Sequence, residues 1–245
     1  MKRFFDLLVA ITGLLVLFPA LILVASLVWL QDFQSPLYMA RRVRKGGSTF
    51  KMIKLRSMVK NADKLGGTST SETDNRITLI GRFIRKAKLD EITQLWNVLI
   101  GQMSLVGPRP QTPFDTGLYT EEEKTLLTIR PGITDLASIV FADEANILSG
   151  SNDPDLLYNQ IIRPWKSRLS IFYVKNNSIN LDILIIFLTL IGMFSRKRAL
   201  RGVQKILSNL HADQELVKIA GRKINLYPFP PPGASSIIDS IPSNH

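Results

Sequence analysis

The clearest pattern in the chain is a nearly unbroken apolar run from Phe4 to Leu30. About 20 apolar residues are enough to cross the hydrocarbon core of a bilayer, so the run predicts a membrane-inserted helix. A secretory signal peptide fits less well, because the run is longer than the usual apolar part and no small-residue cleavage pattern follows it. Pro19 lies in mid-run and removes a helix hydrogen bond, so we expect a bend there.

Basic residues flank this run on both sides, with Lys2 and Arg3 before it and four basic residues between positions 41 and 45 after it. Positive residues prefer the cytoplasmic face, and here both flanks compete for it. A re-entrant helix that bends and returns to the same face satisfies both flanks, whereas a kinked single-pass helix satisfies one. These residues alone leave the two geometries equally open. A single-pass protein with its soluble part outside the cell conflicts with the basic residues after Leu30.

Short strands are predicted between positions 37 and 58, where Lys54 and Arg56 are two residues apart and would share one strand face. Two cations on one face suit a bound anion, although a solvated edge strand explains them equally simply. Residues 61–75 are rich in Gly, Ser, Thr and Asp and predict a mobile loop. A helical pattern resumes at Thr78.

Residues 88–101 have the apolar spacing of a helix that ends at Gly101. Asp90 and Glu91 lie near its start, where the helix dipole favours negative charge. Asp90 shares the polar face with Gln94 and Asn97, and without further context this is an ordinary solvated face.

Pro108 and Pro110 bracket Arg109 and restrict the backbone on both sides of it. A rigidly presented guanidinium suits phosphate recognition, although a turn that happens to contain an arginine is the simpler explanation. A second turn at Arg130–Thr134 follows a helix expected at about Thr120–Ile129.

The last part of the chain contains a shorter apolar run at 181–194, which is too short to span a bilayer comfortably. We expect a helix that lies on the membrane or packs in the core. Residues 199–223 predict a basic helical region, and the proline-rich residues from Asn225 onward predict a disordered tail.

Composition narrows the chemistry. The 245 residues carry a formal net charge of +11, and 45% of them are hydrophobic. This pairing favours phosphorylated substrates or an anionic membrane over nucleic acid, because a nucleic-acid binder has no need of long apolar runs. The chain has no cysteine and only two histidines, so carboxylates, Lys, Arg, hydroxyls and a hard cation are left to perform any catalysis.

The ordered motifs resemble those of the monotopic phosphoglycosyl transferases, the bacterial sugar transferase family. The matching pieces span residues 1 to about 195 and are Lys2–Asp6, Lys54–Met58, Asn75–Thr78, Gly81–Arg85, Leu89–Glu91, Gln94–Leu99, Met103–Pro110, Pro131–Thr134 and Tyr173–Ser178 with Asp182. One such motif would be weak, but this many in order are specific.

The resemblance implies a mainly helical α/β fold with a small sheet. It also implies a re-entrant membrane helix (residues 1–36), a compact cytoplasmic catalytic domain with interfacial amphipathic helices (37–200) and a basic C-terminal extension with a proline-rich tail (201–245). It implies transfer of a sugar 1-phosphate from a UDP-sugar to polyprenyl phosphate at the inner membrane, with Mg²⁺ and release of UMP. By this resemblance Asp90 is the covalent nucleophile and Glu91 the second acid, and both are candidate metal ligands. The implied substrate-binding residues are Lys54, Arg56, Arg85, Pro108, Arg109 and Pro110.

Several positions depart from the family pattern. Ile92-Thr93 replaces a common Leu-Pro, Gln102 replaces a common Asp, and Phe18 precedes Pro19 where some members have Ser. Asp135 and Ser138 replace a common Gly and Gln, which leaves the sugar preference open. The alternative function is a non-catalytic membrane-surface adaptor that binds anionic lipid. Such an adaptor needs the cations but not an acidic pair among them.

Overall fold

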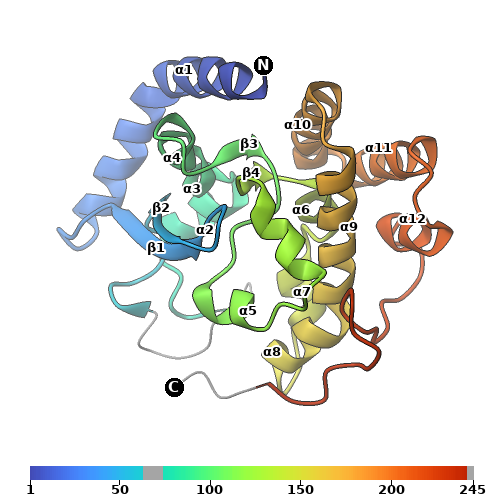
Figure 1. Ribbon diagram of the computed structural model, residues 1–245. Coiled ribbons are helices and arrows are strands. Elements are labelled where there is room, and N and C mark those ends of the chain that lie inside the picture. The colour runs from blue at the N-terminus through green and yellow to red at the C-terminus, as the bar shows by residue number, and fades with distance from the viewer. Residues whose placement is uncertain (63–73, 242–245) are drawn as a thin grey trace.

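The computed structural model describes residues 1–62 and 74–241, and helices dominate it (Figure 1). The mainly helical architecture with little sheet is as predicted. The first half of the described chain contains α1 (Lys2–Leu30), β1 (Leu37–Val43), β2 (Thr49–Leu55), α2 (Leu79–Lys86), α3 (Leu89–Ile92), α4 (Gln94–Leu99), β3 (Ser104–Val106) and α5 (Pro113–Gly117). The second half contains the 3-10 helix η2 (Glu123–Thr128), β4 (Gly132–Thr134), α6 (Leu136–Val140), α7 (Glu144–Leu148), α8 (Pro154–Leu157), the π-helix η3 (Tyr158–Ile162), α9 (Arg163–Asn176), α10 (Ile179–Phe194), α11 (Arg196–Asn209) and α12 (Gln214–Ala220).

Helix α1 is long and apolar enough to cross a membrane, and most of its surface is exposed. Figure 1 shows that the helix changes direction partway along its length, and Pro19 lies inside it. The predicted bend is therefore present. The start of α1 packs near α4 and β3, whereas Val24 and Val28 near its end join Leu55 and Ile84 in a small apolar cluster.

Strands β1 and β2 lie where short strands are predicted, and they form an antiparallel hairpin in which Tyr38 lies opposite Lys54 and Arg42 opposite Phe50. Alternate residues face inward, as a half-buried ribbon requires. The turn between the strands contains Gly46, at a φ of 81°. Most of the predicted loop at residues 61–75 lies outside the described residues.

The segment expected to form one helix from residue 88 to 101 is divided into α3 and α4 at Thr93. The Thr93 hydroxyl donates to Ile53 O (3.0 Å), and the Asn97 amide accepts from Ile53 N (2.9 Å) and donates to Lys51 O (2.9 Å). Gln94 and Asn97 are buried against β2, so the prediction of a solvated polar face is wrong for these two residues. Asn97 and Thr93 complete the hydrogen bonding of the strand edge, whereas Gln94 Nε2 is buried with no hydrogen-bond partner among the described residues.

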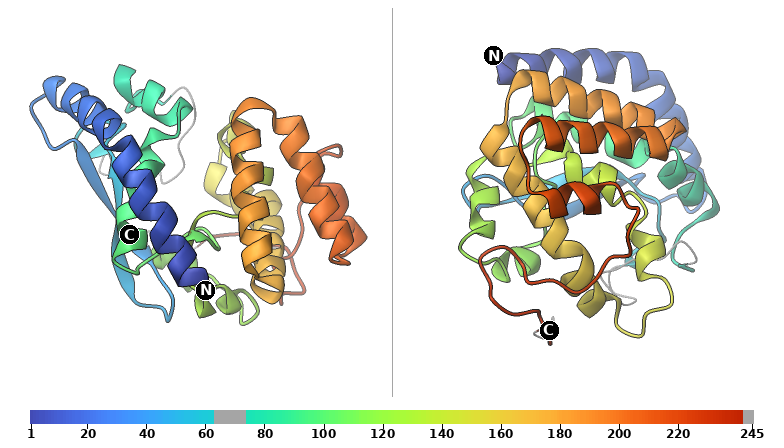
Figure 2. Two further views of the ribbon diagram at one scale, coloured as in Figure 1. Left: turned by 90° about the horizontal axis from the view of Figure 1, so that it is seen from above. Right: turned by 90° about the vertical axis from the view of Figure 1, so that its right-hand side faces the viewer.

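Strands β3 and β4 pair in parallel beside the central core, which α4, α6, α9, α10 and α11 complete. The second apolar run forms α10, and its buried side packs against α11, as one of the two predicted placements requires. The helix expected at about Thr120–Ile129 is a shorter 3-10 helix, η2. Helices α1 and α10 lie at the same end of the molecule (Figures 1 and 2).

The basic region at 199–223 is helical, as predicted, and forms most of α11 and all of α12. The prediction of a disordered tail is wrong for the described residues up to 241. Tyr227 and Phe229 pack their rings against Trp165 of α9, with ring centroids 5.6 and 4.6 Å away. Aromatic residues between the prolines supply the apolar contacts that order this segment.

Candidate active site

Asp90 and Glu91 lie in the single turn of α3. Lys88, directly before that turn, has a φ of 53°, which redirects the chain between α2 and α3. The side chains of Asp90 and Glu91 are 15% and 22% exposed, so both are mostly shielded from water but reachable.

Each carboxylate faces a different cation. Lys54 Nζ of β2 lies 3.6 Å from Asp90 Oδ2, and Arg109 Nη2 donates to Glu91 Oε1 at 2.6 Å. Arg85 of α2 donates to Ser57 Oγ (3.0 Å) and lies close enough for electrostatic interaction with Asp90. The structure thus gathers Asp90, Glu91, Lys54, Arg85 and Arg109 from β2, α2, α3 and the loop after β3.

The two acids respond differently to this environment. Burial raises the pKa of Asp90, and the neighbouring Glu91 adds to this, while Lys54 opposes it. Burial also acts to raise the pKa of Glu91, but Arg109 and Lys54 together outweigh it and lower that pKa. Burial and the nearby Arg109 lower the pKa of Lys54. The environment therefore shifts the two carboxyl pKa values in opposite directions, which is expected of a pair with distinct roles.

Arg109 is held by the backbone around it. Gly107 N donates to Thr134 O (3.1 Å) and Gly132 N donates to Pro108 O (3.0 Å), which joins the loop after β3 to β4. A Cβ on Gly132 would lie 2.1 Å from Gly107 N, so glycine alone permits this approach. Arg109 Nη1 also donates to Ile133 O (3.4 Å).

Of the remaining predicted substrate-binding residues, Pro110 lies beside Arg109, whereas Arg56 lies away from the acids. Pro110 follows Arg109 in the same loop. The next residue, Gln111, accepts a hydrogen bond at its carbonyl oxygen from Val43 N of β1 (2.9 Å). Arg56 points away from the acids: its guanidinium donates to both oxygens of Asp32 (2.6 and 2.7 Å) and to Ser35 O (2.8 Å). The structure does not bring Arg56 to the carboxylates, although Lys54, two residues earlier, is there.

A cleft extends from Arg109 away from the acids. Its open volume is about 530 Å³, including the part open to solvent, and Tyr119, Ser138, Tyr158 and Lys166 lie along it. Burial raises the pKa of both tyrosines well above the usual range, so their hydroxyls stay neutral. The Ser138 hydroxyl is buried and has no hydrogen-bond partner among the described residues. The lining also includes five charged side chains, Arg109, Asp115, Asp135, Arg163 and Lys166, so the cleft suits a polar ligand that bears hydroxyl groups.

A buried ion pair supports one wall of this cleft. Arg163 Nη2 lies 2.5 Å from Glu123 Oε2, and the Ser167 hydroxyl donates to Glu123 Oε1 (2.6 Å). Arg163 also donates to Leu118 O (2.5 Å) and Asn159 Oδ1 (3.0 Å). Sequence reasoning missed this wall, because Tyr119 and Tyr158 belong to no recognisable motif and no spacing rule joins them.

Asp135 and Ser138, two positions that depart from the family pattern, both lie along the cleft. Asp135 Oδ1 accepts from Ser138 N (2.7 Å) at the start of α6, and its Oδ2 accepts from Ser170 Oγ (2.9 Å) of α9. Asp135 is therefore bound within the wall, whereas the buried Ser138 hydroxyl has no hydrogen-bond partner among the described residues.

The site offers a hard metal ion two carboxylates. Among the described residues, no three His, Cys, Asp or Glu side chains gather in a way that could hold a metal. Mg²⁺ is commonly held by one or two carboxylates together with substrate phosphates and water. Asp90 and Glu91 fit that pattern when a diphosphate supplies the remaining oxygens.

Comparison with known proteins gives one consistent result. The family model described as bacterial sugar transferase matches residues 1–196. The exopolysaccharide production protein ExoY of Sinorhizobium fredii is 34% identical, over 77% of this chain and 83% of its own length. The UDP-galactose-lipid carrier transferase of Erwinia amylovora is 36% identical, over 78% of this chain and 39% of its own length. An Aeromonas hydrophila protein, UDP-N-acetylgalactosamine-undecaprenyl-phosphate N-acetylgalactosaminephosphotransferase, is 32% identical, over 77% of this chain and 42% of its own length. The chain thus spans most of the first relative and about two fifths of the other two.

Proposed function

Because this chain belongs to the bacterial sugar transferase family, we propose that it transfers a sugar 1-phosphate from a UDP-sugar to polyprenyl phosphate and releases UMP. The observation that carries the proposal is the position of Asp90, whose carboxylate lies 3.6 Å from Lys54 Nζ beside the Glu91–Arg109 pair. Two relatives are named for sugar transfer to a lipid carrier or to undecaprenyl phosphate, which supports the same chemistry here.

The proposed reaction has two displacements at one phosphorus atom. A carboxylate oxygen of Asp90 attacks the β-phosphorus of the donor, the bond to the bridging oxygen breaks, and UMP leaves with the bonding electron pair. The enzyme then carries the sugar phosphate on Asp90. A phosphate oxygen of the polyprenyl phosphate attacks the same phosphorus, frees the carboxylate and forms the sugar-linked polyprenyl diphosphate.

Cations around the acids make this attack possible. A carboxylate and a diphosphate repel each other, so positive groups must offset the charge as the bond forms. Lys54 and Arg109 lie next to the two acids, and Arg85 lies nearby. Arg109 also orients Glu91, which we assign to metal binding or proton handling.

Bound Mg²⁺ would neutralise phosphate charge and assist departure of UMP, and Asp90 and Glu91 are the residues proposed to hold it. Their oxygen-only donor set suits this ion better than zinc or copper, which favour the nitrogen and sulfur ligands that this site lacks.

We further propose that α1 is re-entrant, with both ends on the cytoplasmic face. Lys2 pairs with Asp182 of α10, and Arg3 donates to Val98 O (2.6 Å). At the other end, Asp32 pairs with Arg56. Both ends of α1 therefore contact the same folded body, which a helix crossing the bilayer could do only if that body lay on both sides.

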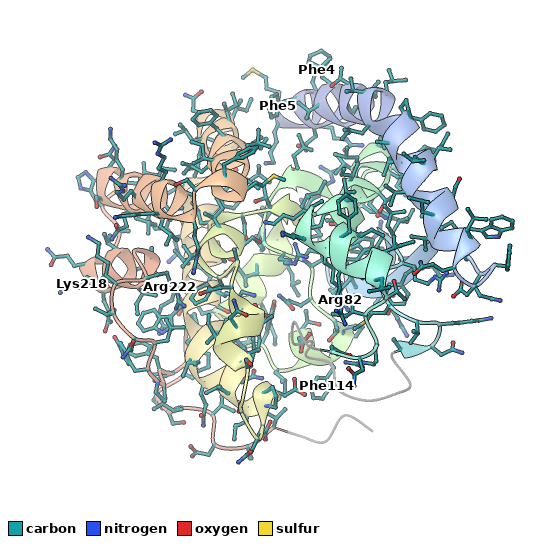
Figure 3. The ribbon with its side chains drawn as sticks, turned by 180° about the vertical axis from the view of Figure 1, so that it is seen from behind. Phe4, Phe5, Arg82, Phe114, Lys218 and Arg222 are labelled. Atoms are coloured by element: carbon teal, nitrogen blue, oxygen red, sulfur yellow. The ribbon has the colours of Figure 1, made fainter. Side chains whose placement is uncertain are left out.

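Apolar side chains on α1 and α10 suit a position in the bilayer surface. Phe4 points outward from α1 (Figure 3), and Phe194, at the end of α10, is 91% exposed. The basic start of α11 follows directly, where anionic headgroups would meet it. A cytoplasmic face of the inner membrane would also give access to cytosolic UDP-sugars.

The experiment is a UMP-release screen with the full chain in detergent, across a panel of UDP-sugars with polyprenyl phosphate and Mg²⁺. We expect one or a few donors to release UMP, and Asp90→Asn to lose that activity by at least about 10³-fold. Mass spectrometry of the protein quenched without acceptor should find the sugar phosphate on the peptide that contains Asp90.

Asp239→Asn is the matched control, because Asp239 is an exposed acid far along the chain from α3. It should retain full activity. Full activity of Asp90→Asn would overturn the covalent mechanism, and an absence of UMP release from every donor would favour the lipid-binding adaptor.

A further inference from the structure

The C-terminal strap, residues 227–238, lies beyond the part of the chain that matches the family model, which ends at residue 196. It contains no helix or strand, yet it runs beside the lower part of α9 (Figure 1) and across the side of the molecule in Figure 2, right. Tyr227 donates to Glu215 of α12, and the other contacts fall into three groups, on elements that form the cleft next to Arg109.

The first anchor is on α9. The Phe229 ring packs on Trp165 (4.6 Å between centroids), and the Arg168 guanidinium carbon lies 4.6 Å from the centre of the Phe229 ring. Arg168 Nη1 also donates to Pro230 O (2.8 Å). The Arg168 guanidinium carbon also lies 5.5 Å from the centre of the Trp165 ring, so the two rings and the guanidinium contact one another in a three-way cluster.

The second and third anchors are on η3 and on the segment before η2. Phe229 N donates to Gln160 O (3.0 Å), and Gln160 Nε2 donates to Ile238 O (2.8 Å), so Gln160 holds the strap at two points. The Thr120 hydroxyl donates to Pro232 O.

Each anchor is next in sequence to residues that line the cleft. Thr120 follows Tyr119, Gln160 follows Asn159, and Lys166 lies between the two α9 residues that hold Phe229. The strap thus connects the two sides of the wall from outside. On the inner side of the wall, the buried Arg163–Glu123 pair connects α9 to η2.

We propose that the C-terminal strap holds the outer wall of the cleft in place and thereby sets the enzyme's affinity for the nucleotide-sugar donor. This inference rests on the proposed function, since it assigns the cleft to the part of the donor beyond the diphosphate. The strap touches neither Asp90 nor Glu91 in any contact of the described residues, so its residues are positioning residues and not catalytic ones.

Gly233 provides a sharp way to disturb the strap. Its φ is 79°, and an added Cβ would lie 3.0 Å from Glu122 Cβ and 3.3 Å from Thr120 Oγ1. Gly150 has nearly the same φ, 81°, but an added Cβ there would meet nothing within 4 Å. Gly233→Ala and Gly150→Ala therefore share the backbone cost, and only the first pushes the strap away from Thr120.

The test measures the steady-state kinetics of UMP release for Gly233→Ala, Phe229→Ala and Gly150→Ala. For the two strap variants we expect the KM for the UDP-sugar to rise about fivefold or more, with kcat changed less than about twofold and the KM for polyprenyl phosphate unchanged. Phe229→Tyr, which keeps the stacked ring, should restore most of the donor affinity. Gly150→Ala should match the wild-type protein.

Direct binding gives a second readout. The UDP-sugar that the UMP-release screen identifies, titrated into Asp90→Asn protein with and without Gly233→Ala, should bind about fivefold more weakly when the strap is disturbed. If Phe229→Ala does not fold, Gly233→Ala and this titration still decide the question.

An unchanged donor KM in Gly233→Ala, or an equal rise for donor and acceptor, would overturn the strap proposal alone. A wild-type protein that releases no UMP would instead overturn the proposed function.

Discussion

Asp90 and Glu91 are adjacent in the chain, yet each has its own cation and its own direction of pKa shift. Burial raises the pKa of Asp90, which suits a nucleophile, and Arg109 and Lys54 lower that of Glu91 against the effect of burial. These opposite directions depend on side chains from other elements and, for Asp90, also on its neighbour Glu91 within α3.

Replacing Lys54 should change the pH dependence of the reaction. Protonated Asp90 cannot attack, so the acid limb of the kcat/KM profile follows the pKa of Asp90. Lys54 lowers that pKa against the effect of burial, so Lys54→Met should raise the pKa and move the acid limb to higher pH. Lys51→Met, an exposed change on the same strand, should leave the limb in place. A limb that stays fixed or moves to lower pH in Lys54→Met would contradict the assignment.

Arg109 and Arg56 should behave differently when each is changed to lysine. Arg109→Lys replaces the planar guanidinium with a single ammonium group and weakens the contact with Glu91, so kcat/KM for UMP release should fall about 10²-fold. Arg56→Lys loosens the pairing with Asp32 and should lower the thermal unfolding temperature while kcat changes less than about twofold. Equal losses of activity in the two variants would show that Arg56 acts at the site after all.

Sequence reasoning located single residues better than it explained them. It selected Lys54, Arg85, Arg109 and the two acids, and the structure brings these together. It also selected Arg56, which pairs with Asp32 instead of approaching Asp90. The spacing of Lys54 and Arg56 in the chain does not indicate which of these acids Arg56 contacts. The partner across the fold decides between the two, and spacing carries no information about that partner.

At the scale of elements, the joint between β3 and β4 determines where Arg109 lies. The two strands are only three residues long, and their ends approach through Gly107 and Gly132. The short parallel pairing therefore depends on backbone contacts that a larger residue would block.

Gly132→Ala should separate this joint. The added Cβ would lie 2.1 Å from Gly107 N, so we expect the free energy of unfolding to fall by about 1–3 kcal/mol or more, together with loss of UMP release. Gly117→Ala is the control, because an added Cβ there meets nothing within 4 Å. Chemical denaturation and UMP release measured on both variants check this. Wild-type stability in Gly132→Ala would mean that the joint can open without cost.

Elements with strong periodic patterns were predictable, and those set by tertiary contacts were not. The apolar runs correctly predicted α1 and α10, and short strands were correctly predicted in the region of β1 and β2, although their pairing as a hairpin was not. The division between α3 and α4 was not visible, because Thr93 ends the helix by bonding to Ile53 O of β2, 40 residues earlier. The order of the C-terminal strap was missed because its proline content conceals the stacking of Phe229 on Trp165.

For the whole molecule, the two attached ends of α1 lead to a topology prediction. The chain has no cysteine, so introduced cysteines can be labelled without background. A cysteine inserted after Met1 and Lys45→Cys should both be protected from an impermeant maleimide in intact cells and both react after the inner membrane is opened. Labelling of one position from outside would rule out the re-entrant geometry in favour of a single pass.

The ion pairs that hold the two ends of α1 also differ in when they can form during synthesis. The pairing of Asp32 with Arg56 joins residues 24 positions apart, whereas Lys2 and Asp182 are 180 positions apart. Between residues 56 and 182 a ribosome working at about 5–20 residues per second needs on the order of ten seconds. The nearest of the N-terminal contacts, from Arg3 to Val98 O, joins residues 95 positions apart, so it also forms after the pairing of Asp32 with Arg56. The first turns of α1 must therefore reach their depth in the lipid before the residues that later hold them have been synthesised.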